Sequence, residues 1–200
     1  LPDFHVGGLA IRARAHLSGA RIVDAWSADT KWAAAEFVLS LEASQATLTS
    51  LVPTQVFDLV RERLACPTLV RAVVVGGGAL SDELRGSAQA LGWPLLPSYG
   101  MTELGSQVAT APLESAMASG TVSGGAPVGG AKAASAMILL DHIEARLFES
   151  SRLGLRGPSL LTGYLVRESV RPTGPAWVFV DPKVNGWLLT EDRVELSFEA

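Results

Sequence analysis

The chain has 200 residues, 48% of them hydrophobic and 18% charged, with a formal net charge of −4. This composition is typical of a globular protein and excludes an intrinsically disordered one. Nonspecific nucleic-acid binding needs clustered positive charge, so the acidic balance and the scattered Lys and Arg exclude that function as well. No stretch reaches the ~18 consecutive apolar residues that a membrane-spanning helix needs.

The single cysteine, Cys66, bears on the compartment and on metal binding. One thiol cannot form an internal disulfide or a thiolate zinc cluster. We therefore expect a reduced, cytoplasmic setting in which Cys66 is an inert buried thiol. The chain opens with Leu1-Pro2-Asp3-Phe4-His5 and no methionine, which predicts a piece of a longer fold.

The first part of the chain, residues 1–110, is predicted to alternate helices and strands. The expected elements are a helix over 29–41 capped by Asp29 or Thr30, a strand over 48–52, a helix from Pro53, a strand over 69–75, a helix capped by Ser81 and ended by Gly92, and a short strand before Ser98. The β-branched run at 69–75 is typical of a strand buried on both faces of a parallel sheet. Because open α/β sheets bind ligands at the carboxyl ends of their strands, the glycines that follow this run mark a candidate site.

The composition changes after about residue 111, where Ala, Gly and Ser become dominant. Residues 115–136 are predicted to form loops and weak strands. Further strands are expected at 136–140, 143–149, 153–156 and 176–180, separated by Gly, Pro and Asp. The predicted fold is therefore α/β, with a layered, mostly parallel sheet and flanking helices over 1–110, followed by a β-rich, distorted-barrel subdomain over 111–200.

The segment Ser98-Tyr99-Gly100-Met101-Thr102-Glu103 combines residue types that suit a nucleotide. We expect it at a turn from a strand into a helix, where backbone N–H groups and the helix dipole can bind phosphate. There the Thr102 hydroxyl can donate to a phosphate oxygen, the Glu103 carboxylate can bind Mg²⁺, and the Tyr99 ring can stack on a base. Taken alone, the string fits an ordinary strand-end turn equally well, with Thr102 as a helix cap and Glu103 in the first turn.

Four motifs, in the same order, resemble the adenylate-forming acyl-CoA ligase (AMP-binding) superfamily. They are residues 1–9, similar to "LPLFHxxG"; 75–80, similar to "GGAxL"; 99–103; and 156–164 with 186–192, similar to "RGP…GY…GWxxTGD". Residues 51–55, together with the His-containing start, most resemble the o-succinylbenzoate–CoA ligase branch of the family, which serves menaquinone synthesis.

The resemblance implies an ATP-dependent carboxylic acid–CoA ligase. In this family a carboxylate attacks the α-phosphate of ATP to give an acyl-adenylate and pyrophosphate, and coenzyme A then displaces AMP. The implied cofactors are ATP or AMP and Mg²⁺, with coenzyme A as co-substrate and o-succinylbenzoate as the expected acid. The chemistry depends on charge neutralisation more than on a covalent nucleophile.

Within the matching motifs, the resemblance also implies roles for particular residues. Thr102 would contact phosphate, Glu103 would bind Mg²⁺, and Asp192 would accept hydrogen bonds from the ribose hydroxyls. Tyr99 would stack on adenine beside a glycine turn in which any side chain would block the base. The expected sites are Thr102, Glu103 and His5 for catalysis; Gly76, Gly77, Gly78, Tyr99, Gly100, Met101, Thr102 and Asp192 for the nucleotide; His5, Ser98 and Gln107 for the acid; and Glu103 for the metal.

The sequence departs from the family pattern in two ways. The family's TGD is Thr190-Glu191-Asp192 here, so Glu191 adds a side chain beside the expected ribose carboxylate. The family's glycine- and hydroxyl-rich phosphate loop and its lysine-bearing C-terminal domain are absent from these 200 residues. We therefore expect part of the large N-terminal domain, with reduced or no activity alone. Such a piece should expose apolar surface through which it forms a homodimer.

Each motif also has a purely structural interpretation. Gly76–Gly78 fits a tight turn, His5 a solvated or core histidine, and Asp192 a surface charge. Two other functions stay open. One is another acyl- or aryl-CoA ligase of the same superfamily, which the acyl pocket would distinguish. The other is a non-catalytic nucleotide-binding or interaction module derived from a ligase, which the missing segments favour.

Overall fold

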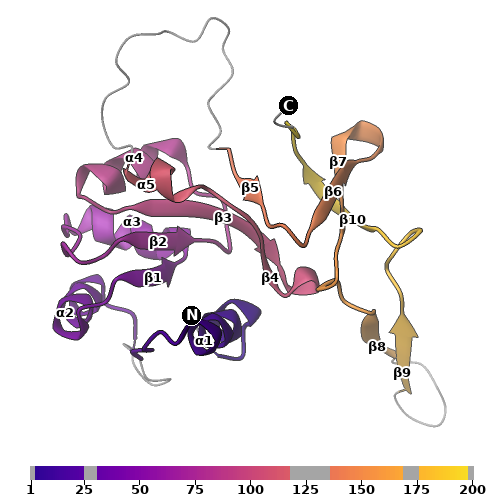
Figure 1. Cartoon of the computed structure of the whole chain (residues 1–200), viewed down its shortest axis with the longest axis horizontal. Coiled ribbons are helices and arrows are strands. Elements are labelled where there is room, and N and C mark those ends of the chain that lie inside the picture. Colours follow the sequence, from indigo (N-terminus) through magenta and orange to yellow (C-terminus); the bar gives the residue numbers. More distant parts are fainter. Residues whose placement is uncertain (1–2, 25–30, 118–135, 169–175, 198–200) are drawn as a thin grey trace, which may run out of the picture. The chain divides into compact units, whose positions relative to one another are not determined.

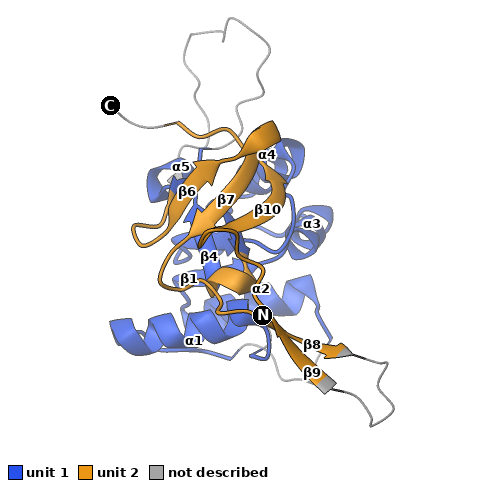
Figure 2. Cartoon of the chain, turned by 90° about the vertical axis from the view of Figure 1, so that its right-hand side faces the viewer, with its two compact units in different colours: residues 1–100, 106–138 blue, residues 101–105, 139–200 orange. Residues whose placement is uncertain are grey.

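The computed structural model describes residues 3–24, 31–117, 136–168 and 176–197 (Figure 1). The chain divides into two compact units, one of residues 1–100 and 106–138 and the other of 101–105 and 139–200 (Figure 2). The predicted division at residue 110 stays a prediction. No helix in the described ranges has both the length and the apolar character that crossing a bilayer requires.

The first unit is built on a sheet with the strand order β1-β2-β3-β4-β5. The strands of this sheet are β1 (Leu48–Leu51), β2 (Ala72–Val75), β3 (Leu95–Met101), β4 (Ser106–Thr110) and β5 (Ile138–Leu139); the last residues of β3 and β5 fall within the second unit. The helices of the first unit are α1 (Val6–Ser18), α2 (Ala34–Ser44), α3 (Pro53–Arg61), α4 (Asp82–Ala90) and α5 (Leu113–Met117). Strands β1, β2 and β3 pair in parallel, with α3 and α4 as the crossovers. The predicted α/β class is confirmed.

Two helices of this unit begin where their sequences predict. In α3, Pro53 takes the first position, where its missing N–H costs nothing, and the Val52 N–H donates to Gln55 Oε1 at 3.0 Å. In α4, Ser81 Oγ accepts from the Leu84 N–H at 3.2 Å. Helix α2 instead begins at Ala34 without a side-chain cap. The predicted caps for it, at residues 29 and 30, lie outside the described residues, as does most of the segment 115–136.

The core of the first unit is formed by the sheet together with α2, α3 and α4. It contains Phe37 and Leu41 of α2, Val56 and Leu59 of α3, Ala88 of α4, and Leu51, Val73, Val75 and Leu95 of the strands. Trp93, which is 1% exposed, fills its centre and donates from Nε1 to the Leu64 carbonyl at 2.8 Å. Because the indole N–H has a partner, this large side chain is buried without leaving a polar group unsatisfied.

The second unit is β-rich. Strands β6 (Glu144–Leu147), β7 (Arg152–Arg156) and β10 (Leu188–Arg193) form an antiparallel sheet in the order β10-β7-β6, and β8 (Tyr164–Glu168) pairs with β9 (Ala176–Val180) as a separate hairpin. Two short 3₁₀ turns, Thr102–Leu104 and Glu149–Ser151, belong to this unit. The buried side chains of Leu153, Leu155 and Leu188 lie on the β7–β10 pair.

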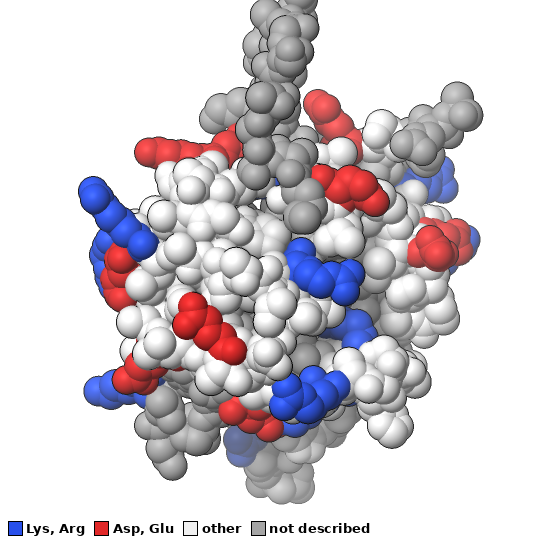
Figure 3. Space-filling model, turned by 60° about the vertical axis from the view of Figure 1, so that its left-hand side comes forward, with Lys and Arg blue, Asp and Glu red and all other residues white. Residues whose placement is uncertain are grey.

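Charges of both signs are interspersed on the face of the molecule shown in Figure 3. The described residues on this face form no continuous basic area. Nonspecific nucleic-acid binding relies on a basic patch that neutralises several phosphates, and its exclusion stays a prediction from the sequence.

Candidate functional site

The segment after β3 is a 3₁₀ turn, and the predicted helix at this point is wrong. Strand β3 runs on through Met101, Thr102–Leu104 form one turn, and β4 begins at Ser106. Gly105 ends the turn because it adopts a left-handed φ of 72° and donates its N–H to the Thr102 carbonyl at 3.1 Å. Without a following helix there is no aligned dipole, so any phosphate contact here rests on the exposed Thr102 hydroxyl and local N–H groups.

Gly100 lies where the backbones of β3 and β4 come closest. A Cβ at this position would be 1.9 Å from the Ser106 carbonyl oxygen and 3.1 Å from Gln107 Cα. Ser106 has a φ of 113°, which is rare for a residue with a side chain. The packing of this chain therefore requires glycine at 100, independently of the nucleotide contact that the motif implies, and that contact stays a prediction.

The glycine loop after β2 differs from Gly100, because the described structure requires glycine at only one of its three positions. Gly77 needs glycine because its φ is +79°. At Gly76, however, a Cβ would lie 3.6 Å from the Ser98 carbonyl oxygen, and at Gly78 it would lie 3.6 Å from Pro53 Cγ, both ordinary contacts. The packing of the described residues therefore does not explain glycine at 76 and 78. Since the loop follows the carboxyl end of β2, its open backbone suits a flat ring.

Two of the predicted acid-site residues, Ser98 and Gln107, belong to one hydrogen-bond network. Ser98 Oγ donates to the Ala109 carbonyl and lies 3.2 Å from Thr110 Oγ1, while Gln107 Nε2 donates to the same Thr110 oxygen at 2.5 Å. Thr110 is not among the predicted site residues, because no local pattern in the sequence indicates a strand that returns beside β3. The Thr110 hydroxyl therefore links the two side chains and fixes their orientation.

His5 caps helix α1. Its Nδ1 accepts from the Gly7 N–H at 3.2 Å, so a neutral ring carries its proton on Nε2. The side chain is exposed, and α1 contacts β4, the strand that carries Gln107. The cap thus leaves Nε2–H as the ring donor for a ligand, and the role of His5 in binding the acid stays a prediction.

Glu103 is anchored within the second unit through both its backbone and its side chain. Its carbonyl accepts from the Leu161 N–H at 2.8 Å, and its Oε1 accepts from the Tyr164 hydroxyl at 2.8 Å. This hydrogen bond raises the pKa of Tyr164, because the carboxylate favours the protonated phenol. Next to this contact, Lys183 Nζ donates hydrogen bonds to the carbonyls of Leu161 and Thr162 at 3.1 and 2.7 Å.

The surroundings of Glu103 limit the kind of metal site that it can form. Among the described residues, no group of three or more His, Cys, Asp or Glu side chains could hold a metal ion. Mg²⁺ in nucleotide enzymes is bound by one or two carboxylates together with phosphates and water. Glu103, half-buried and fixed in place, fits such a site as a single protein ligand.

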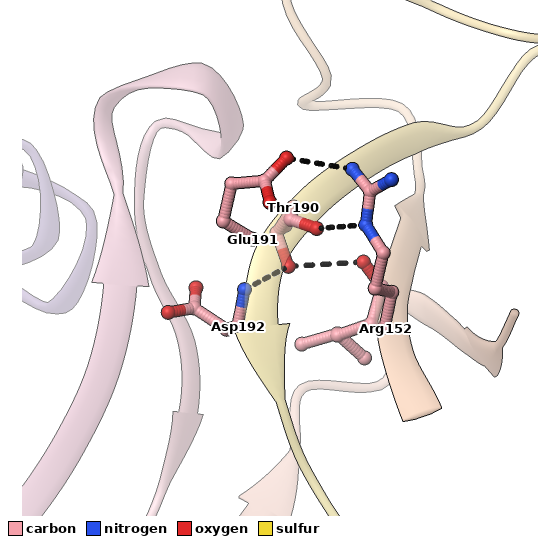
Figure 4. Close-up of polar contacts among 5 residues, drawn as sticks. Arg152, Thr190, Glu191 and Asp192 are labelled. Atoms are coloured by element: carbon pink, nitrogen blue, oxygen red, sulfur yellow. Dashed lines mark hydrogen bonds and ion pairs between the residues drawn. The ribbon is translucent and has the colours of Figure 1, made fainter. Parts of the chain in front are cut away.

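Asp192 lies on β10 beside Thr190 and Glu191, and its side chain is exposed. Its N–H donates to Thr190 Oγ1 at 3.1 Å, while Glu191 pairs with Arg152 Nη2 at 2.8 Å (Figure 4).

The predicted site residues are divided between the two units of the chain. The first unit holds His5, Gly76, Gly77, Gly78, Ser98, Tyr99, Gly100 and Gln107, and the second holds Met101, Thr102, Glu103 and Asp192.

Cys66 is half-buried, its Sγ 3.6 Å from the Pro67 carbonyl oxygen. Burial raises the pKa of the thiol from its ordinary 9.0 to about 12. Because the thiolate is the reactive form, we expect iodoacetamide at pH 8 to alkylate the native chain at least about 100-fold more slowly than the urea-unfolded chain.

The same shift makes stability depend on pH. Both forms of the protein hold a neutral thiol below pH 9.0, whereas between there and about 12 only the unfolded form ionises. The free energy of unfolding should therefore fall as the pH rises through this window, and Cys66→Ala should flatten the decline. Equal alkylation rates for the native and unfolded chains would contradict the burial of this thiol.

Comparison with known proteins places these motifs in a family. A family model described as "AMP-binding enzyme" matches residues 1–165. The 2-succinylbenzoate–CoA ligase of Bacillus subtilis is 28% identical over 199 residues, which cover 100% of this chain and 38% of that protein. The same enzyme from Bacillus pumilus is 30% identical over 194 residues, covering 96% and 36%.

Solved structures of o-succinylbenzoate CoA synthetases are also similar to this chain. The o-succinylbenzoate CoA synthetase of Bacillus subtilis, a double mutant bound to a product analogue, superposes with a TM-score of 0.72 at 26% identity, covering 96% of this chain and 36% of that one. MenE of E. coli superposes with a TM-score of 0.68 at 25% identity, covering 98% and 36%. The chain thus spans 36 to 38% of the length of these relatives. Because the family model matches well over half of the chain, the chain belongs to the AMP-binding enzyme family.

Proposed function

We propose that this chain is part of an ATP-dependent carboxylic acid–CoA ligase that works through an acyl-adenylate, with o-succinylbenzoate as the acid, in menaquinone synthesis. Support for the acid comes from the curated relatives, which are named 2-succinylbenzoate–CoA ligases. Support also comes from two structural neighbours at 25 and 26% identity, whose ligands are an analogue of OSB-AMS and the product analogue OSB-NCoA. ATP, Mg²⁺ and coenzyme A are the co-substrates and metal that this reaction uses.

The observation that carries the proposal is the open glycine loop after β2. Contacts among the described residues do not explain glycine at 76 and 78, but adenine lying against that backbone, with Tyr99 as the stacking ring, would explain it. In the same unit, His5, Ser98 and Gln107 would contact the acid. The Thr110 hydroxyl would hold the last two in place.

In the second unit, three side chains would bind the polar parts of the nucleotide. Asp192 would accept from the ribose hydroxyls and Thr102 would donate to phosphate. Glu103 would bind Mg²⁺, which when present neutralises phosphate charge during adenylation. The Tyr164 hydroxyl and the Leu161 N–H fix the Glu103 carboxylate and backbone before any ligand binds.

Calorimetric titration of the 200-residue chain tests the proposal. We expect a non-hydrolysable o-succinylbenzoyl-adenylate analogue to bind more tightly than AMP, and AMP more tightly than the free acid. Glu103→Gln should remove the Mg²⁺ dependence of ATP binding and leave metal-free AMP binding unchanged. Glu149→Gln, in the other 3₁₀ turn of the same unit, is the matched control and should behave as the wild type.

Two results would count against the proposal. If neither AMP nor the adenylate analogue binds, the chain has no functional nucleotide site. If Mg²⁺ dependence persists in Glu103→Gln, this carboxylate is not the metal ligand.

An interaction module derived from a ligase is the second candidate, and the β8–β9 hairpin favours it. On one face of the hairpin Leu165 lies opposite Phe179, and Trp177 lies on the same face. These side chains are 69%, 57% and 66% exposed. Exposed apolar groups of this size in a two-stranded sheet are typical of a contact surface, through which the expected homodimer would form. Failure of every ligand in the titration would favour this function.

A further inference from the structure

Strand β10 carries a two-residue insertion beside β7, and it contains Asp192. The pairing runs regularly through Leu189 opposite Gly154 and resumes at Arg193 opposite Arg152. Between these pairs β10 advances four residues while β7 advances two. The segment 190–192 therefore bulges out of the ladder, and such bulges commonly redirect a side chain.

Four polar contacts hold this bulge in one conformation (Figure 4). Thr190 Oγ1 donates to the Leu153 carbonyl at 3.0 Å and accepts from the Asp192 N–H at 3.1 Å. From β7, Arg152 Nε donates to the Thr190 carbonyl at 3.1 Å, and its Nη2 pairs with Glu191 Oε1 at 2.8 Å. The planar guanidinium of Arg152 thus forms hydrogen bonds to two consecutive residues of the bulge.

The ion pair between Arg152 and Glu191 adds little to the stability of the fold, so stability does not explain why the bulge is held in this way. The side chains of Arg152 and Glu191 are 37% and 92% exposed, and ion pairs at such exposure contribute little to stability. The contact between Arg152 and Glu191 instead affects the directions in which two carboxylates point. Arg152 turns the Glu191 carboxylate toward itself, while the Asp192 carboxylate points to the opposite side (Figure 4). Two neighbouring carboxylates are thereby kept apart, although Glu191 stands where the family pattern has glycine.

We propose that Arg152 and Thr190 are positioning residues that fix Asp192 for the ribose hydroxyls, and that Arg152 compensates for Glu191 at the glycine position. This inference rests on the ribose role proposed for Asp192. It predicts that Arg152 acts on nucleotide binding only through the hydroxyl contacts of Asp192. Its effect should therefore disappear when either Asp192 or the hydroxyls are removed.

The test compares AMP with 2′,3′-dideoxyadenosine monophosphate, which lacks both hydroxyls. The readout is the ratio of their dissociation constants. We expect the wild type to prefer AMP about tenfold or more, as hydrogen bonds to a charged group allow. Asp192→Ala should abolish the preference. Arg152→Ala should lower it about threefold or more, leave dideoxy-AMP binding unchanged, and have no further effect in the Asp192→Ala background. Arg146→Ala, on the neighbouring strand β6, is the control and should retain the preference.

The outcomes separate this inference from the proposed function. A wild type that prefers AMP, together with Arg152→Ala that keeps the full preference, would overturn the inference alone. Equal weakening of both ligands in Arg152→Ala would assign Arg152 a merely structural role and overturn it too. If that variant loses its fold, Arg152→Lys provides the second measurement. A single amine cannot hold both Thr190 and Glu191 as the guanidinium does, so the preference should fall, and Glu191→Gly in the same background should restore it. A full preference in Arg152→Lys, or no recovery on adding Glu191→Gly, would also overturn the inference. A wild type that binds both ligands equally would overturn the ribose role of Asp192, and the inference with it.

Discussion

Gly100→Ala is expected to lower the free energy of unfolding of the first unit by about 3 kcal/mol or more. The added methyl carbon would lie 1.9 Å from the Ser106 carbonyl oxygen and 2.8 Å from its carbonyl carbon. These are backbone atoms of β4, so no change of rotamer relieves the overlap. Relief requires β3 and β4 to separate, which would strain the contact that Ser98 Oγ makes with the Ala109 carbonyl.

Urea unfolding followed by tryptophan fluorescence, to which the buried Trp93 in the core of this unit contributes, measures the loss. Gly86→Ala is the matched control, because Gly86 lies in helix α4 and a Cβ there would meet no atom of the described part of the chain within 4 Å. An alanine in the helix interior should stabilise the chain by roughly 0.5–1 kcal/mol. If Gly100→Ala unfolds within about 1 kcal/mol of the wild type, the close approach of the two strands is wrong.

The parts of the fold that the sequence predicts are those encoded by neighbours in the chain. Pro53 and Ser81 begin α3 and α4 as expected, because caps act within one helical turn. The β-branched run before Gly76 becomes β2, with the parallel neighbours that its continuous apolar pattern indicates. These signals need no knowledge of the tertiary structure.

The turn after β3 shows where local reasoning fails. Thr102 and Glu103 form a plausible start of a helix, but Gly105 adopts a left-handed conformation and the chain returns beside β3. Whether a glycine ends a turn or tolerates a helix depends on what packs against it. The strand β4, and with it the role of Thr110, could therefore not be predicted from the residues that precede it.

In the candidate site, too, the sequence identifies the residues of a motif but not their long-range contacts. The motifs identify Asp192 and Glu191, but the bond from Glu191 to Arg152 joins residues 39 positions apart. Such a contact depends on the register of β7 and β10 and on the insertion in β10. The sequence likewise marks Gly76, Gly77, Gly78 and Gly100 as a set, whereas the structure shows that they are glycines for different reasons.

Gly76→Ala should separate ligand binding from stability. A methyl group at 76 would lie 3.6 Å from the Ser98 carbonyl oxygen, an ordinary contact, so the free energy of unfolding should change by less than about 1 kcal/mol. If adenine lies against this backbone, the same methyl group occupies its place. We therefore expect AMP affinity to fall about tenfold or more, as measured by calorimetry on the folded variant.

Gly77→Ala provides the opposite case in the same loop. Its φ of +79° makes a side chain costly, so stability should fall by about 1–2 kcal/mol. Gly86→Ala, in α4, should change neither AMP affinity nor the enthalpy of binding. Should Gly76→Ala bind AMP as tightly as the wild type does, the glycine loop would serve backbone geometry alone. The adenine contact would then have to be sought elsewhere in the chain, because it rests on glycine at 76 having no explanation in the packing of the described residues.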